Sequence, residues 1–208
     1  MVHSKISIKD GVFSRFYKGR IINTSEPQDW IIVGVAPKIQ RVWYKESYKD
    51  GNTTAPTCWS NDGKKPDADV ENAPSNLCMS CSNDIKGSGG GNSKACKHSL
   101  RLAVLLPEEL NGDLYRVILS STSIFGKNKV GKYPYNAYTE YLTQYELSVA
   151  HVVTQAFFEF ENGRPKVLFK PVRAITPEEY KVVSQRSEGS SEITRLKIVK
   201  DPDFSTIT

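Results

Sequence analysis

The chain has 208 residues, of which 38% are hydrophobic and 25% are charged, and its formal net charge is +5. This length suffices for one hydrophobic core, with or without an inserted module. No apolar run approaches the roughly 18 residues of a transmembrane helix, so no membrane span is expected. Residues 1–13 have neither the apolar segment nor the cleavage pattern of a signal peptide, and a cytoplasmic location is therefore expected.

Positive charge is concentrated in two parts of the chain. Residues 1–45 carry a net charge of +5 and residues 84–132 carry +4, whereas residues 46–83 between them carry −3. Basic clusters of this kind are typical of proteins with a polyanionic partner. A solvated surface without a partner can have the same composition, so charge alone does not identify the function.

The first 45 residues predict short strands. Residues 6–22 alternate well enough for one or two strands, with a turn at Asp10-Gly11. Residues 30–35 form the apolar run of a buried strand, and alternation resumes at residues 39–45 after Ala36-Pro37. Arg41 and Trp43 share one face of the latter segment. A cation beside an aromatic ring on a strand is suited to a phosphate and a base, although strand aromatics more often belong to the core.

All four cysteines follow within a short stretch, with the spacing Cys58-x19-Cys78-x2-Cys81-x14-Cys96. A CxxC pair places two thiolates on one turn, and one cysteine on either side completes a tetrahedral site. The intervening residues are mostly Gly, Ser, Asn, Asp and Pro, which bury too little apolar surface to fold unaided. Residues 57–98 are therefore expected to form an inserted module held by structural zinc.

Two other interpretations of the cysteines remain open. An iron–sulfur cluster uses the same four ligands, and spacing does not distinguish it from zinc. Disulfides or unrelated free thiols are the other possibility. Disulfides are rare in the reducing cytosol, and the clustering of the cysteines argues against unrelated thiols.

The segment after the cysteines predicts two strands and a basic loop. The strands are expected at residues 99–107 and 114–121. Residues 123–132 then place three lysines and two glycines around Phe125. This composition suits a nucleic-acid backbone, but it lacks the Gly-Lys-Ser/Thr ending of a nucleotide-binding P-loop.

The last third of the chain predicts two helices and a hairpin. A helix is expected after Pro134, with a stripe of apolar and aromatic residues that packs on a sheet: Tyr138, Tyr141, Leu142 and Tyr145. Residues 149–160 and 166–172 predict a hairpin around Asn162-Gly163. A second helix is expected from Thr176, with Pro177 at its first position and a capping box to Glu179.

These elements together favour a mainly β (α+β) fold. About five core strands with a helix before the last two are typical of an OB-type β-barrel, whereas a sandwich needs more strands. Residues 1–187 are expected to form this barrel with two flanking helices and the zinc module 57–98 inserted. Residues 188–208 form a tail that is either a late strand or disordered.

Several segments together resemble a family of phage and prophage single-stranded-DNA-binding proteins with a four-cysteine motif inserted in an OB-like domain. They include PTCWS at Cys58, LCMSC at Cys78 and Cys81, ACKHS at Cys96, and SSTSIFGKN, and the resemblance covers roughly residues 30–180. It implies that the four cysteines are the metal ligands, and that the protein acts in phage replication or recombination in the host cytoplasm. Many such proteins recruit replication enzymes through an acidic tail. Residues 188–208 carry 4 acidic and 3 basic residues, so this mode of recruitment is in doubt here.

The expected function is non-catalytic, sequence-tolerant binding of single-stranded DNA, with phosphates on basic residues and bases on exposed rings. The expected DNA contacts are Arg41, Trp43, Trp59, Lys97, Arg101, Arg116, Phe125, Lys127 and Lys129. One alternative is a zinc-bearing protein that binds a host polymerase or replication enzyme, which would need an exposed apolar patch. A metal-dependent nuclease is less favoured, because the clustered Asp62, Asp67 and Asp69 lie in the insertion and not on a core strand. No Ser–His–Asp or Cys–His set stands out.

Overall fold

The computed structural model describes residues 4–45, 55–161, 163–187 and 196–198. Within these residues the chain divides into two compact units. The first unit comprises residues 4–35 and 100–187 together with Leu196. The second unit comprises residues 36–45 and 55–99 together with Lys197 and Ile198. Most of the expected tail, 188–208, lies outside the described residues.

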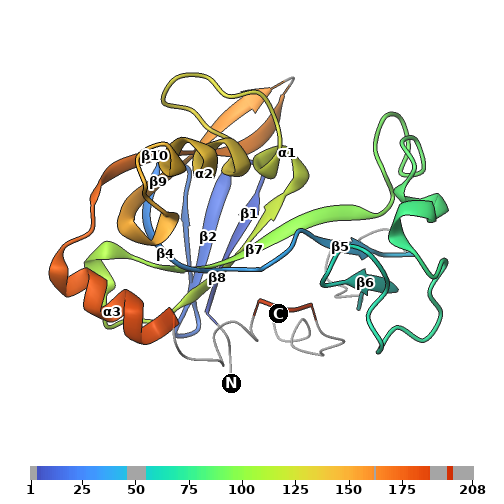
Figure 1. Cartoon of the computed structure of the whole chain (residues 1–208), viewed down its shortest axis with the longest axis horizontal. Helices are drawn as coiled ribbons and strands as arrows, with labels where there is room; N and C mark the ends of the chain where they lie inside the picture. Colours follow the sequence, from blue (N-terminus) through green and yellow to red (C-terminus); the bar gives the residue numbers. More distant parts are fainter. Residues whose placement is uncertain (1–3, 46–54, 162, 188–195, 199–208) are drawn as a thin grey trace. The chain divides into compact units, whose positions relative to one another are not determined.

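The first unit is built on a curled sheet, and the mainly β class expected from the sequence is confirmed (Figure 1). Its strands are β1 (Lys5–Lys9), β2 (Val12–Tyr17), β3 (Arg20–Thr24), β4 (Gln28–Val35), β7 (Lys97–Leu105), β8 (Tyr115–Ser120), β9 (Val152–Glu161) and β10 (Arg164–Ala174). Their order across the sheet is β10-β9-β4-β7-β8-β1-β2-β3. Strand β1 runs parallel to β8, whereas β4 runs antiparallel to both β7 and β9.

The curl brings strands that are distant in the sheet order into contact. Phe13 in β2 stacks on Phe158 in β9 with ring centroids 4.2 Å apart, and it also meets the edge of Trp30 in β4. Beside them, the Phe160 ring lies so close to Gly11 that a Cβ there would be 2.7 Å from it. Gly11 also has a φ of 80°, so both the Asp10-Gly11 turn and the ring contact favour glycine.

The amino-terminal part contains three strands, one more than the sequence predicts. The additional strand is β3, which pairs with β2 from Phe13↔Thr24 to Tyr17↔Arg20. Its first four residues are all exposed. An edge strand with little burial does not need the apolar alternation from which strands are predicted.

The described part of the chain contains three helices, in place of the two expected. They are α1 (Ser121–Ile124), α2 (Tyr135–Thr143) and α3 (Pro177–Ser187). Short 3₁₀ turns occur at η1 (Cys78–Ser80), η2 (Ser82–Asp84), η3 (Pro107–Glu109) and η4 (Val149–His151). The predicted stripe on α2 is only half buried. Tyr138 and Leu142 are in the core, and the Tyr138 hydroxyl bonds Thr154 at 2.8 Å, whereas Tyr145 lies beyond the helix end and is exposed.

Helix α3 packs on the core through Val183, which contacts a cluster that includes Ile31, Leu105 and Val153. The predicted capping box at its start is confirmed. The Thr176 amide donates to a Glu179 carboxylate oxygen at 2.7 Å, and the Glu179 amide donates to the Thr176 hydroxyl at 3.2 Å. Arg173 adds two bonds of 2.7 Å to the same carboxylate and lowers its pKa.

Replacing Glu179 should destabilise the first unit. Glu179→Ala removes the reciprocal cap and leaves Arg173 without its carboxylate, so we expect a loss of about 1–3 kcal/mol in the free energy of unfolding. Urea denaturation measures this loss. Glu178→Ala is the matched control, because Glu178 is exposed in the same helical turn and its loss should change stability by less than about 0.5 kcal/mol. Equal effects of the two variants would contradict a structural role for the cap.

Candidate nucleic-acid interface and cysteine pocket

The cysteine pocket of the second unit begins with a small three-stranded layer. Strand β5 (Gln40–Trp43) pairs on one side with β6 (Cys58–Ser60) and on the other with the first residues of β7. Cys58 lies opposite Trp43, and Cys96 immediately precedes β7. The strand pairing therefore brings two cysteines that are 38 positions apart to either side of β5.

Of the other two cysteines, Cys78 begins the turn η1 and Cys81 lies between η1 and η2. The Cys81 amide donates to the Cys78 carbonyl at 3.3 Å, which closes the CxxC segment into a tight turn. The Cys96 amide donates to the Asn83 carbonyl at 2.8 Å and so attaches this turn to the start of β7. Backbone hydrogen bonds thus join the CxxC turn to the strand layer.

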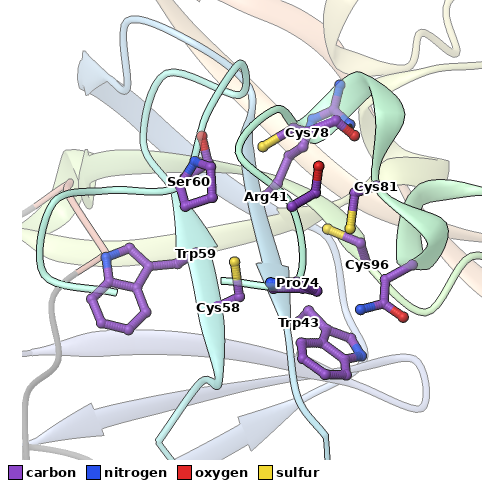
Figure 2. Close-up of a pocket in the computed structure, with 12 residues that line it drawn as sticks. Arg41, Trp43, Cys58, Trp59, Ser60, Pro74, Cys78, Cys81 and Cys96 are labelled. Carbon is purple, nitrogen blue, oxygen red and sulfur yellow. Dashed lines mark hydrogen bonds between the residues drawn. The ribbon is translucent and has the colours of Figure 1, made fainter. Parts of the chain in front are cut away.

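All four cysteines line one pocket, together with Arg41 and Trp43 (Figure 2). The cysteines are free thiols, and Figure 2 shows the sulfur atoms of Cys81 and Cys96 turned toward each other. Within the described residues, no three His, Cys, Asp or Glu side chains are arranged closely enough to hold a metal ion. The donor set is nevertheless the soft, four-sulfur set that zinc and iron–sulfur clusters use.

The pKa values of Cys58, Cys78 and Cys96 are raised, so these three thiols are disfavoured as anions. Burial raises the pKa of Cys58 to about 11 and that of Cys96 to about 12, and the neighbouring Cys78 and Cys81 act in the same direction. Burial also raises the pKa of Cys78. A divalent cation would supply the positive charge that thiolates lining this pocket need.

Arg41 does not present its guanidinium to solvent. It forms an ion pair with Asp84 and donates to the Cys78 carbonyl at 3.5 Å. Lys94 and His98 contact the same Asp84 carboxylate at 3.0 Å each. Burial alone would raise the pKa of Asp84, but the hydrogen bonds from Lys94, His98 and Arg41 outweigh burial and lower it. Arg41 is thus engaged by groups of its own unit, and its expected contact with DNA stays a prediction.

The expected contacts Trp59 and Arg101 are buried, with exposed fractions of 3% and 6%, and we withdraw both. Trp43 is half-buried and lines the cysteine pocket, so its ring belongs to the pocket wall. Lys97 is exposed and donates to the Lys94 carbonyl. The sequence predicts Trp59, Lys97 and Arg101 as contacts because they border the cysteine module, and Trp43 because it shares a strand face with Arg41; neither criterion reveals side-chain burial.

The acidic cluster of the insertion stabilises turns. Asp62 accepts hydrogen bonds from the amides of Lys64 and Lys65 at 2.7 and 3.1 Å. Asp67 accepts from the amide of Asn61 at 3.1 Å. The Asn61 side chain in turn bonds both backbone groups of Ile198, accepting from its amide at 2.7 Å and donating to its carbonyl at 2.9 Å.

The second candidate site lies in the first unit and contains the lysine loop, defined here as residues 125–132. Both ends of this loop are attached to β10. The Ser123 hydroxyl just before it accepts from the Val167 amide at 2.9 Å, and Tyr133 just after it exchanges two backbone bonds with Phe169 at 3.0 and 2.8 Å. In Figure 1 the loop lies beside the tip of the β9–β10 hairpin.

Three lysines of this region surround one carboxylate. Lys132 contacts Glu159 at 3.2 Å, Lys166 at 3.5 Å and Lys129 at 3.6 Å. The hydrogen bond from Lys132 is the main cause of a lowered pKa at Glu159. The expected contacts Phe125 and Lys127 are exposed on the same loop, and Phe125 has an exposed fraction of 43%.

Sequence reasoning missed Lys132, Lys166 and Glu159 as members of this site. The hairpin turn contained the signal, because Asn162-Gly163 as a two-residue turn fixes Glu161 opposite Arg164 and hence Glu159 opposite Lys166. The convergence of the lysine loop on this pair has no comparable local signal.

Arg116, the remaining expected contact, lies on β8 opposite Lys5 of β1. The Lys5 ammonium also lies 4.7 Å from the centre of the Phe16 ring on β2. Burial and the neighbouring Arg116 lower the pKa of Lys5. Lys5, Arg116 and Phe16 therefore lie side by side on three neighbouring strands. In the order of the sheet these strands are separated from β10, to which the lysine loop is attached.

No described helix is both long and apolar enough to cross a membrane. No protein-family model, curated protein or solved structure matches this chain.

Proposed function

We propose that the protein binds single-stranded DNA without catalysing a reaction, and that the lysine loop with strands β9 and β10 is the contact surface. The observation that carries this proposal is the convergence of three lysines within 3.6 Å of one carboxylate: Lys129 and Lys132 from the loop that also exposes Phe125, and Lys166 from β10. Ammonium groups gathered in this way suit phosphates, and a neighbouring ring suits a base of any identity.

An OB-type barrel is the finer description that we propose for the first unit. Its support is the strand order: β4, β7 and β8 are consecutive neighbours, α2 follows them, and β9 and β10 return to the other side of β4. In such a barrel the residues between β4 and β7 and those between β9 and β10 are the two loops that bind oligonucleotides. The cysteine module and the hairpin tip beside the lysine loop occupy these two connections.

We further propose that Cys58, Cys78, Cys81 and Cys96 hold one structural zinc ion. Support comes from the pocket that the four thiols share and from the polar composition of residues 57–98. Bound zinc would supply crosslinking and charge neutralisation, because four thiolates leave no coordination position for a substrate. The fold would contribute by holding the CxxC turn near Cys58 and Cys96, which lie on either side of β5.

A role in phage replication or recombination, in the host cytoplasm, is the biological setting that the resemblance of the cysteine segments supports. A second candidate function is binding to a replication enzyme. It is favoured by one observation, the exposure of all three large aliphatic residues of the module, Leu77, Met79 and Ile85. Exposed apolar side chains that form a continuous patch are typical of a protein-binding surface.

A binding comparison tests the proposal. Fluorescence anisotropy with labelled single-stranded DNA, duplex DNA and RNA should show the tightest binding to a single strand, because rings stack only on unpaired bases. Across a salt series, log affinity should fall with log salt by roughly 0.7 for each phosphate contacted, hence about 2–3 for the lysines named here. Equal affinity for duplex DNA, or no binding by folded protein, would contradict it; the latter would favour the replication-enzyme candidate.

A further inference from the structure

Glu159 lies where an anion would be expected to bind. Its carboxylate is reached by ammonium groups from two separate elements, the lysine loop and β10, at 3.2–3.6 Å. Among the residues that the structure describes, Glu161 pairs with Lys166 alone, at 3.0 Å. Three cations thus share two carboxylates, and the group retains one positive charge.

The geometry that suits this carboxylate also suits a phosphodiester. Both groups carry about one negative charge and present two equivalent oxygens to hydrogen-bond donors. Lysine ammonium groups are flexible point charges that do not require a planar partner, so they can pass from one anion to the other without rearrangement of the backbone.

The cations remain reachable from solvent. Lys129 has an exposed side-chain fraction of 71%, and Lys132 is about half exposed. Lys166 is mostly covered and is held across the hairpin register from Glu159. An incoming phosphate can therefore engage the two loop lysines first, while Lys166 stays on the strand.

Resting on the proposed single-strand binding, we infer that Glu159 is an internal counter-anion that a DNA phosphate displaces. In the free protein it holds the loop lysines together over β9 and β10. On binding, the phosphodiester takes its place among the ammonium groups. Because each lysine then exchanges one anion for another, a single phosphate gains little. A DNA strand, which makes several phosphate contacts at once, is therefore favoured over a mononucleotide.

Neutralising this carboxylate should tighten DNA binding. With a labelled oligothymidylate of about 16 nucleotides, we expect Glu159→Gln to bind at least about threefold more tightly than the unmodified protein, since two or three exposed ion pairs no longer oppose the exchange. The matched control is Glu161→Gln, which removes the same charge from the same hairpin but not from the loop lysines. Its affinity should change by less than about twofold.

A second variant separates position from charge. Glu159→Asp keeps the charge but withdraws the carboxylate by one methylene group from Lys129 and Lys132, so its affinity should lie between the unmodified protein and Glu159→Gln. If the melting curve shows that Glu159→Gln is not folded, the affinity of Glu159→Asp tests the inference in its place. A general effect of charge on DNA attraction predicts no change for Glu159→Asp.

A double-mutant cycle completes the test. Lys129→Ala should weaken binding more in the Glu159→Gln background than in the unmodified protein, because only there is its phosphate contact unopposed. The inference is overturned if Glu159→Gln binds no more tightly than Glu161→Gln, or if the cycle shows no coupling, while all proteins still bind DNA. Absence of DNA binding by every folded variant would instead overturn the proposed function.

Discussion

Chelation of the metal should disorder residues 57–98 while the first unit stays folded. Protein purified without added metal should contain about one equivalent of zinc, and its removal should raise amide exchange and protease cleavage across this module. The reason is that Leu77, Met79 and Ile85 are exposed and supply no core. Structural zinc sites contribute on the order of 10 kcal/mol to the folding of comparably small modules.

Cys78→Ser should have the same effect as chelation, because a hydroxyl is a poor zinc ligand. Met79→Ser is the matched control, since it introduces the same side chain at the adjacent, exposed position and should leave exchange unchanged. Unaltered exchange across 57–98 after metal removal would mean that the module is held by other forces. Iron with visible absorbance, found in place of zinc, would indicate an iron–sulfur cluster and would reopen a redox role.

Loss of Phe125 and loss of the loop lysines should weaken DNA binding in different ways. Phe125→Ala should cost about 1–3 kcal/mol of binding free energy and leave the salt dependence unchanged, because stacking releases few counterions. Lys127→Ala combined with Lys129→Ala should weaken binding and reduce the slope of log affinity against log salt by roughly 0.7 for each lost contact. Anisotropy over a salt series measures both quantities.

Matched controls for both changes are available on α3. Tyr180 and Lys181 are exposed there, so Tyr180→Ala and Lys181→Ala should leave affinity and slope unaltered. Melting curves establish that each variant is folded. A salt slope that falls with Phe125→Ala but not with the lysine variants would contradict the division of roles. Trp43→Ala is less suitable as the aromatic test, because its ring lines the cysteine pocket and its loss would disturb the module.

Elements with strong local signals were predictable. The Asn-Gly turn specified the β9–β10 hairpin, and the Thr176–Glu179 capping box specified the start of α3. Strand β3 was not predictable, since its exposed residues carry no alternation. The sequence therefore supports the mainly β class, with individual edge strands left undetermined.

The environment of a side chain was harder to predict than its place on an element. Alternation correctly put Arg41 on a strand, but its partner Asp84 lies 43 residues further along the chain and no local pattern joins them. Trp59 and Arg101 were expected to contact DNA because they border the cysteine module in the sequence, yet the fold covers both. Long-range pairing of this kind depends on the tertiary structure.

The side chain of Asn61 takes the place of a neighbouring strand for Ile198, because its amide satisfies both backbone groups of that residue. Asn61 lies three positions after Cys58, whereas Ile198 lies 137 positions further along the chain. Order at the cysteines and order near the carboxyl end are therefore thermodynamically linked. Any change that stabilises the segment around Asn61 should therefore also stabilise the backbone at Ile198.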